Sequence, residues 1–285
     1  MKLKANAKIN LFLEVLNKRK DGYHNIRTVF QEISLADDIF ITEKRETDAK
    51  QHAKQTRNNN MIKICCDNPE IPTDKKNLVY KAAMLLKKQF NIKKGVEIKI
   101  KKRIPVGAGL GGGSSDAAAV LKGLNRLWEL NLTKTQFIKI AKQIGADVPF
   151  FVLGGRCFGE GIGDKLTPLK IKKKEWYVMV KPQFDISTKS AYSLLTKSQK
   201  ISKINKLGNR LEDVIIRHYP EIKKIKEKLI KYGAEFSLMS GSGSGVFGIV
   251  RNKKEGNEIK NQLKKDGYTV WLVHTVKAGK RQVKG

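Results

Sequence analysis

Residues 107–118 read GAGLGGGSSDAA and place five glycines and two serines in their first nine positions. Glycine loses more backbone freedom on folding than any other residue, so a cluster this dense indicates a backbone that must approach something closely. The preceding stretch VEIKIKKRIP (96–105) alternates apolar and polar residues, which predicts a strand that ends at the proline. Apolar residues then recur every three or four positions, which predicts a helix over residues 114–128 capped by Ser114 or Ser115.

The glycine-rich stretch therefore joins a strand to a helix, and the start of a helix attracts anions. The first N–H groups of a helix have no intrahelical acceptor and lie at the positive end of the helix dipole. Glycines would let phosphate oxygens reach those N–H groups, and the hydroxyls of Ser114 and Ser115 could bind a phosphate oxygen or Mg²⁺. A simple turn would need one or two glycines, so this density predicts a phosphate-binding loop.

Three better-known nucleotide motifs do not account for this loop. Gly107, Gly109 and Gly112 satisfy G-x-G-x-x-G, but a dinucleotide fingerprint follows an apolar strand at the start of a βαβ unit, whereas this strand is rich in lysine. The P-loop pattern requires a lysine before its Ser or Thr, and none stands between Gly113 and Ser114. The sequence also lacks the H-R-D and D-F-G triplets of protein kinases.

Length and composition set bounds on the fold. With 285 residues the chain is near the size at which cores divide, so we expect two domains, with one large mixed domain as the alternative. An apolar share of 40% and a charged share of 30% are typical of soluble globular proteins. The sequence has no apolar stretch of membrane-helix length and no leader cleavage site, so we expect a cytoplasmic protein. Its cysteines and histidines lack metal-ligand spacing, which argues against structural zinc.

The formal net charge of +31 is compatible with a nucleic-acid-binding protein. The basic residues are, however, spread along the whole chain, and lysine supplies most of them without an arginine-rich arm or interleaved aromatic residues. We therefore favour solvated faces and keep nucleic-acid binding as the alternative from a different functional class. The same positive field would also attract a phosphorylated substrate.

Periodicity and turn residues predict the other elements of the chain. The predicted strands cover residues 8–16, 25–35, 38–43, parts of 156–181, 234–240, 246–250 and 269–276. The predicted helices cover residues 73–90 and 133–144, two segments on either side of Pro220, and one before residue 269. Residues 44–60 are polar without an apolar period, which predicts an exposed loop, and the seam between two halves is expected within residues 158–169.

The stretch PVGAGLGGGSSDAA (105–118) resembles the phosphate loop of the galactokinase, homoserine kinase, mevalonate kinase and phosphomevalonate kinase superfamily. The stretches ANAKINLFLEVLNKRKDGYHNIRTVF (5–30) and GADVPFF (145–151) extend the resemblance to essentially the whole chain. Together they are similar to members that use ATP and Mg²⁺ to phosphorylate the 2-hydroxyl of a cytidine diphosphate-linked methylerythritol in the non-mevalonate isoprenoid pathway. Another member, such as a mevalonate kinase, is the alternative within the superfamily.

The resemblance implies an α+β fold with two domains. The N-terminal ATP-binding domain would cover residues 1–155 and resemble a ribosomal-protein domain, and the C-terminal substrate-binding domain would cover residues 156–285 and be ferredoxin-like. The implied partner is the small-molecule substrate, with neither nucleic acid nor a membrane, and the implied assembly is a monomer or a weak homodimer.

The resemblance assigns chemical roles to residues that have plainer explanations. A lone aspartate such as Asp147 is more often a helix or turn cap, and a lysine such as Lys8 in an edge strand is usually a solvated charge. In a strand, Lys8 shares a face with Asn6 and Asn10. The resemblance implies that Asp147 is the catalytic base, that Lys8 hydrogen-bonds Asp147 and the reacting hydroxyl, and that Asn10 helps to hold the polyol.

The stretch DGYH (21–24) would be a hairpin turn on its own. The resemblance implies instead that Tyr23 stacks on the cytosine and His24 bonds its polar edge, with Tyr192 as the second aromatic residue. Stacking of a base on an aromatic side chain is worth roughly 1–3 kcal/mol, enough to select a cytidine-bearing substrate over a bare alcohol.

A second glycine-rich stretch, MSGSGSGVFG (239–248), matches the third motif of the superfamily, in which backbone N–H groups approach substrate and phosphates. Its implied substrate-binding residues are Gly241, Ser242 and Gly243. The pair Ser244-Gly245 departs mildly from the family pattern, and GNRLED (208–213) has Arg210 where an acid is common, while Asn209 and Glu212 match. We expect a structural effect at most from Arg210.

The implied ATP-binding residues surround the first loop. They are Pro105, Val106, Gly107, Ala108, Gly109, Leu110, Gly111, Gly112, Gly113, Ser114 and Ser115, with Asn77 and Lys102 as candidates for the adenine pocket by position. No residue is predicted as a dedicated metal ligand.

Overall fold

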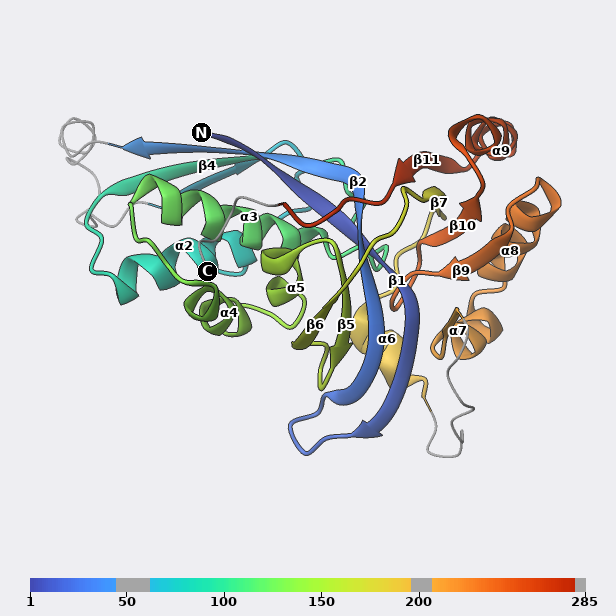
Figure 1. Cartoon of the computed structure of the whole chain (residues 1–285), viewed down its shortest axis with the longest axis horizontal. Helices are drawn as coiled ribbons and strands as arrows, with labels where there is room; N and C mark the ends of the chain where they lie inside the picture. The colour runs from blue at the N-terminus through green and yellow to red at the C-terminus, as the bar shows by residue number, and fades with distance from the viewer. Residues whose placement is uncertain (45–61, 196–206, 280–285) are drawn as a thin grey trace.

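The computed structural model describes residues 1–44, 62–195 and 207–279, which form two β-sheets with helices packed against them (Figure 1). The larger sheet has seven strands in the order β3-β4-β2-β1-β8, with β5 paired to β2 and β6 to β5. These strands are β1 (Lys2–Lys18), β2 (His24–Lys44), β3 (Ile62–Cys66), β4 (Gly95–Lys101), β5 (Arg156–Glu160), β6 (Lys165–Leu169) and β8 (Gly208–Asn209).

The strands β1 and β2 form one long antiparallel pair. The prediction of separate strands at 25–35 and 38–43 is therefore wrong, because both belong to β2. The residues between them stay paired to β1, with Ala36 opposite Asn6 and Asp37 opposite Ala5, and a register shift beside Asn6 takes up the irregularity.

The strand β4 ends at Lys101, before the proline that was expected to end it. The backbone N–H groups of Arg103 and Ile104 donate to Oδ1 of Asp37, at 2.5 and 2.8 Å, instead of to a neighbouring strand. The Asp37 carboxylate thus satisfies backbone groups that a longer strand would have paired in the sheet.

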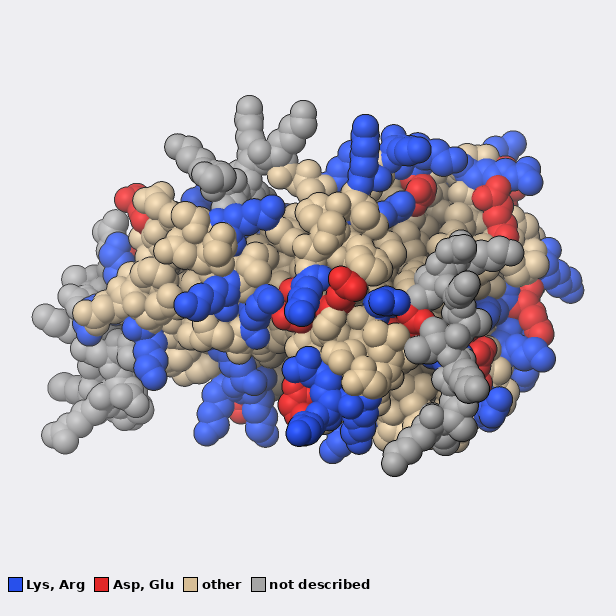
Figure 2. All heavy atoms as spheres, turned by 60° about the horizontal axis from the view of Figure 1, so that its bottom comes forward, with Lys and Arg blue, Asp and Glu red and all other residues tan. Residues whose placement is uncertain are grey.

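Charged side chains are dispersed over the face drawn in Figure 2. On the face drawn in Figure 2, Lys and Arg side chains occur from one end of the molecule to the other, with Asp and Glu among them. Several acidic groups pair with these cations, for example Asp164 with Lys142 and Asp266 with Lys228, each at 2.8 Å. This dispersion is the arrangement expected of solvated faces rather than of one nucleic-acid-binding patch.

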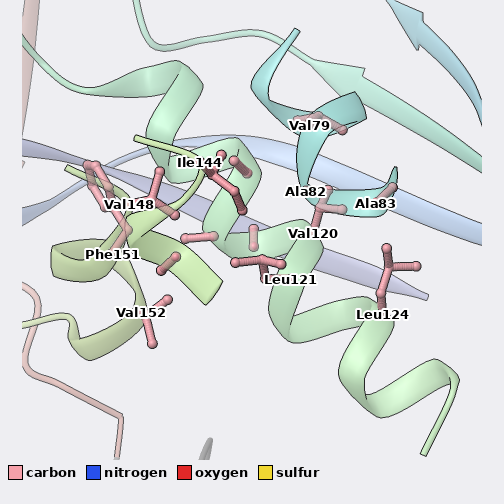
Figure 3. Packing of buried hydrophobic residues seen from close by; sticks show 14 of the residues in the cluster. Val79, Ala82, Ala83, Val120, Leu121, Leu124, Ile144, Val148, Phe151 and Val152 are labelled. Carbon is pink, nitrogen blue, oxygen red and sulfur yellow. The ribbon is translucent and has the colours of Figure 1, made fainter. Parts of the chain in front are cut away.

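Four helices cover one face of the larger sheet (Figure 1): α2 (Leu78–Gln89), α3 (Gly112–Leu127), α4 (Lys134–Lys142) and α5 (Val148–Leu153). Figure 3 shows Val79, Ala82 and Ala83 of α2 beside the apolar side chains of α3. Small alanines allow the two helices to approach closely, and Ile39 and Ile98 of the sheet complete this core. The predicted helices at 73–90, 114–128 and 133–144 are confirmed within a few residues of their ends.

The smaller sheet has four antiparallel strands in the order β11-β7-β10-β9. They are β7 (Trp176–Lys181), β9 (Phe236–Met239), β10 (Val246–Val250) and β11 (Thr269–His274). The helices that accompany it are α6 (Thr188–Ser193), α7 (Glu212–His218), α8 (Glu221–Lys231) and α9 (Lys253–Lys265). As predicted, the helical segment is interrupted at Pro220, which separates α7 from α8.

A shared apolar cluster joins the two sheets. Ile9 and Ile33 of the larger sheet pack with Tyr177, Met179 and Phe247 of the smaller one. The larger sheet also takes in β5, β6 and β8, all of which follow residue 155 in the chain. The division into domains 1–155 and 156–285 stays a prediction, and the mixed α+β fold class is confirmed.

The helix after the glycine-rich loop begins earlier than its sequence predicts. Its cap is Gly111 at φ 70°, in the left-handed region, and α3 starts at Gly112. Ser115 is already inside the helix, where its Oγ donates to the carbonyl oxygen of Asn6 at 2.6 Å, so the prediction of a serine cap is wrong. The exposed loop predicted from residue 44 lies largely outside the described residues. Within the described ranges, no helix combines the length and the apolar character needed to span a membrane.

Candidate active site

A cavity of about 850 Å³ is lined by residues of β1 and β2, by both glycine-rich stretches, by the GADVP segment and by α6 with the residues before it. Most of the residues that the sequence singled out contribute to its wall: Lys8, Asn10, Tyr23, His24, Gly107, Gly109, Gly111, Gly112, Gly113, Ser114, Asp147, Tyr192, Gly241 and Ser242. The cavity therefore brings together the two glycine-rich stretches, the DGYH turn and the GADVP segment. We call residues 107–113 the first loop and residues 240–245 the second loop.

Lys8 and Asp147 face each other across this cavity. The Nζ atom of Lys8 lies 4.0 Å from Oδ2 of Asp147 and donates to Oδ1 of Asn10 at 2.6 Å. Lys8 is 5% exposed, and its backbone N–H donates to the carbonyl oxygen of Leu110 in the first loop at 3.0 Å, so it is not the solvated edge-strand charge of the plainer interpretation. Burial lowers the pKa of Lys8, and the Asp147 carboxylate opposes that shift.

Asp147 immediately precedes α5, at the N-cap position, where an aspartate often caps the helix. In the part of the chain that the structure describes, its carboxylate makes no capping hydrogen bond. About a third of the side chain (32%) is exposed, on the wall of the cavity. A carboxylate that is not used by its own helix and lies beside a buried ammonium is placed to accept a proton from a bound molecule.

The first loop owes most of its glycines to close contact with other parts of the protein. A Cβ on Gly109 would lie 2.2 Å from the carbonyl oxygen of Ser240 in the second loop, and φ at Gly109 is +68°. A Cβ on Gly111 would lie 2.8 Å from the Phe151 ring and 3.3 Å from Cε of Lys8. Backbone N–H groups of Ser244 and Gly245 donate to carbonyl oxygens of the first loop, at 3.1 and 3.2 Å. The two loops therefore form one unit.

The start of α3 keeps the properties of an anion site. Among the described residues, no side chain caps its first N–H groups, and the Gly111 cap has no side chain to do so. Gly112, Gly113 and Ser114 line the cavity, and a Cβ on Gly113 would first meet Leu78, at 3.9 Å, within the described residues. Phosphate oxygens could therefore reach the backbone here, as the sequence predicts for this loop.

An aromatic pair forms the far end of the cavity. The rings of His24 and Tyr192 have centroids 5.2 Å apart and are tilted by 34°, while Tyr23 beside them is 58% exposed. Burial lowers the pKa of His24, with Lys18 adding to the shift, so the neutral imidazole is favoured. Burial raises the pKa of Tyr192, and Asp147 adds to that shift. A neutral imidazole and an aromatic face are therefore available to a planar base at this part of the cavity wall.

Other predicted site residues have structural contacts instead of positions on the cavity wall. Asn77 caps α2, accepting from the N–H of Val79 at 2.8 Å and donating to the carbonyl oxygen of Pro72 at 2.6 Å. Lys102 is buried between Asp37 and Asp116, with Nζ 2.5 and 3.1 Å from their carboxylates. Their roles in binding ATP stay predictions, as do the ATP-binding roles of Pro105, Val106, Ala108, Leu110 and Ser115 and the substrate-binding role of Gly243.

Sequence reasoning missed two residues that hold the second loop. Nδ2 of Asn209 donates to the carbonyl oxygens of Met239 and Gly241, at 2.8 and 2.7 Å. One oxygen of Glu212 accepts from the N–H of Met239 at 2.6 Å, and the other pairs with Lys226. The match of both residues to the family pattern in GNRLED was the available signal.

Within the described residues, no group of three or more His, Cys, Asp or Glu side chains is arranged to hold a metal ion. The carboxylates on the cavity wall are those of Asp147 and of Asp21, which is paired with Arg19 at 2.8 Å, and Ser114 adds a hydroxyl oxygen to the lining. Such a donor set suits a cation that arrives with its own phosphate ligands better than a resident metal.

Comparisons with known proteins agree with this arrangement. The family model of the GHMP kinases N terminal domain matches residues 77–155, and that of the GHMP kinases C terminal matches residues 192–269. The chain is 40% identical to a 4-diphosphocytidyl-2-C-methyl-D-erythritol kinase of Enterococcus faecalis over 96% of its own length and 98% of that protein.

Solved structures give the same result. A crystal structure of a 4-(cytidine 5'-diphospho)-2C-methyl-D-erythritol kinase superposes with a TM-score of 0.81 at 30% identity, covering 98% of this chain and 100% of that one. The mevalonate kinase of Methanococcus jannaschii superposes with a TM-score of 0.71 at 15% identity, covering 97% and 98% of the two chains. At that identity the second likeness concerns the fold alone.

Proposed function

The chain belongs to the 4-diphosphocytidyl-2-C-methyl-D-erythritol kinase family of the GHMP kinases, and we propose that it phosphorylates the 2-hydroxyl of that cytidine diphosphate-linked alcohol. As a kinase of this family it uses ATP as the phosphoryl donor. The observation that carries the proposed mechanism is the pair Lys8 and Asp147, 4.0 Å apart on the same cavity as the open start of α3.

In the proposed mechanism Asp147 is the base. The acceptor oxygen forms a bond to the γ-phosphorus of ATP while the bond from that phosphorus to the β–γ bridging oxygen breaks. The proton of the acceptor hydroxyl passes to the Asp147 carboxylate, and ADP leaves. Lys8 hydrogen-bonds the reacting hydroxyl and favours its alkoxide character, since a buried ammonium stabilises negative charge at an adjacent oxygen.

The triphosphate of ATP would bind at the start of α3, held by backbone N–H groups of residues 107–114. Mg²⁺ bound to the phosphates would supply charge neutralisation for the transferred group. Ser114 and Asp147 are the residues on the cavity wall whose oxygens suit that ion. These roles rest on oxygens and N–H groups that take part in no capping hydrogen bond of α3 or α5 in the described structure and are therefore available to a ligand in the cavity.

The aromatic end of the cavity would select the cytidine group. We assign the flanking of the cytosine ring to Tyr192 and Tyr23, and a hydrogen bond to its polar edge to His24. Asn10, Gly241 and Ser242 would contact the remainder of the substrate between the base and Lys8. The site would thus lie at the junction of the proposed domains 1–155 and 156–285. We also propose that the protein is cytoplasmic and is a monomer or a weak homodimer.

One assay tests this function against its alternatives. Purified protein with ATP and Mg²⁺ is offered the cytidine diphosphate substrate, mevalonate and homoserine, and ADP formation is measured for each. We expect turnover with the cytidine-bearing alcohol, and a product whose phosphorus spectrum shows a 2-phosphomonoester. Turnover confined to mevalonate would support the other kinase, and tight salt-dependent DNA binding without turnover would support the nucleic-acid alternative.

A further inference from the structure

Behind Lys8 a chain of three hydrogen bonds runs into the sheet. Lys8 Nζ donates to Asn10 Oδ1 at 2.6 Å, Asn10 Nδ2 donates to Thr28 Oγ1 at 2.7 Å, and the Thr28 hydroxyl donates to the carbonyl oxygen of Phe12 at 2.7 Å. Thr28 is 0% exposed and Asn10 is 2% exposed. Three consecutive polar groups are thus connected in a region closed to solvent.

We propose that Thr28 is a positioning residue, which fixes the amide of Asn10 so that Lys8 keeps its ammonium directed at Asp147. The proposal rests on the roles proposed above for Lys8 and Asp147. Thr28 lines no part of the cavity in the described structure and acts through Asn10.

The direction of the chain follows from the number of hydrogens available. The Thr28 hydroxyl has a single hydrogen, which goes to the Phe12 carbonyl, so it can only accept from Asn10. Asn10 must then present its NH₂ group to Thr28 and its oxygen to Lys8. If the amide turned around, its NH₂ group would face the ammonium of Lys8, and two donors would oppose each other.

The strand geometry explains why this threonine reaches the asparagine. In the pairing of β1 with β2, Asn10 lies opposite Phe30, whereas Leu13 lies opposite Thr28. A register shift between Asn10 and Phe12 brings an extra residue into β1 and leaves the Asn10 side chain beside Thr28.

The surroundings of Lys8 leave its ammonium few other partners. Asp147 of α5 is the charged group that faces it, and the Phe30 ring of β2 lies 5.7 Å from Nζ. Gly241 of the second loop lies close to the Lys8 ammonium and the Asn10 amide, since a Cβ on Gly241 would lie 3.1 Å from both Asn10 Oδ1 and Lys8 Nζ. A side chain at position 241 would therefore crowd the ammonium of Lys8 and the amide of Asn10.

The test compares Thr28→Val, which keeps the shape and loses the hydroxyl, with Thr28→Ser, which keeps the hydroxyl. We expect Thr28→Val to lower kcat by roughly tenfold with the KM for ATP changed less than about twofold, since transition-state and not ground-state contacts are weakened. The alkaline limb of kcat against pH should move to lower pH, because Lys8 loses the acceptor that favours its charged form. Thr28→Ser should stay within about twofold of the wild type.

A double-mutant cycle separates this role from a structural one. If Thr28 acts through Asn10, Thr28→Val should cause no further loss of kcat in the Asn10→Ala background. Additive losses, or a lower melting temperature with an unmoved alkaline limb, would reject the proposal. Loss of turnover in Asp147→Asn together with wild-type kinetics in Thr28→Val would also reject it, while the proposed function would stand.

Discussion

The two loops have similar sequences, and the structure uses them differently. In the first loop, Gly107, Gly109 and Gly111 all have positive φ and have protein atoms where a Cβ would lie. At Gly113, inside α3, the nearest described atom to a Cβ would be a Leu78 carbon 3.9 Å away, so this glycine leaves open space at the cavity wall. In the second loop, Gly241 lines the same cavity, and a Cβ there would lie 3.1 Å from both Lys8 Nζ and Asn10 Oδ1. A dense run of glycines can thus indicate close contact between two loops as well as contact with a ligand.

The loops also differ in what supports them from behind. A buried ion-pair cluster of Asp37, Lys102 and Asp116 lies under the start of α3, with Lys102 Nζ 3.0 Å from where a Cβ on Gly112 would be. The second loop is held through its backbone by Asn209 and by Glu212, a carboxylate paired with Lys226. Side-chain charge supports the first loop, and directed hydrogen bonds support the second.

The largest effect is expected where the loops touch. Gly109→Ala would put a methyl group 2.2 Å from a backbone oxygen at a φ that alanine avoids, so the loops must separate. We expect kcat/KM to fall by more than about 100-fold and the free energy of unfolding to drop by roughly 2–4 kcal/mol. Urea unfolding and steady-state kinetics measure both quantities.

Gly113→Ala is the matched control for this comparison. The new methyl group has space among the described residues and stands inside α3, so the free energy of unfolding should stay the same or rise by up to about 1 kcal/mol. The KM for ATP should rise, because the methyl group stands where phosphate would approach. Equal losses of stability in the two variants would contradict the distinction between the two kinds of glycine.

A smaller effect is expected at the support of the second loop. Asn209→Ala leaves the buried carbonyl oxygens of Met239 and Gly241 without their donor, which should cost roughly 2–3 kcal/mol of unfolding free energy. The KM for the cytidine substrate should rise several-fold while the KM for ATP changes little. Asp213→Asn, an exposed neighbour in α7, serves as the control and should match the wild type.

The smallest effect is a pH dependence at the support of the first loop. Burial raises the pKa of Asp116 to about 8, Lys102 opposes the shift and Asp37 adds to it. In the unfolded chain this carboxyl has its ordinary pKa near 3.8, so between these values the folded protein binds more protons. Stability from this group is therefore present at acid pH and is lost as the pH rises through 8.

Melting temperatures test this dependence. Between pH 5 and pH 9 the wild type should lose roughly 3 °C more than Asp116→Asn, which carries no titrating group at this position. Parallel curves for the two proteins would show that Asp116 is ionised at neutral pH and would contradict this prediction.

The sequence could predict the residues whose role depends on identity and local spacing. Alternation along β1 places Lys8 and Asn10 on one face, and the motifs that contain His24, Asp147 and Tyr192 bring those residues to the same cavity. It could not predict contacts that depend on tertiary packing. Gly111 replaces a serine as the cap of α3 because Ser115 bonds to Asn6 in β1, a residue far away in the chain.

The proposed role of Thr28 could not be predicted from the sequence for a related reason. A threonine in a predicted strand is an ordinary strand residue, and its hydrogen bond to Asn10 depends on a register shift that no local pattern reveals. Asn77 and Lys102 illustrate the converse, since their positions near the loops suggest ligand contacts, whereas the structure engages them in a helix cap and an ion-pair cluster.

The turnover of Asp147→Asn with ATP and the cytidine diphosphate substrate tests the central claim most directly. The amide keeps the size of the side chain and cannot accept the hydroxyl proton as a carboxylate does, so kcat should fall by at least about 100-fold with little change in melting temperature. Lys8→Ala should show a comparable loss. Undiminished kcat in both variants would contradict the assignment of this cavity as the site of phosphoryl transfer.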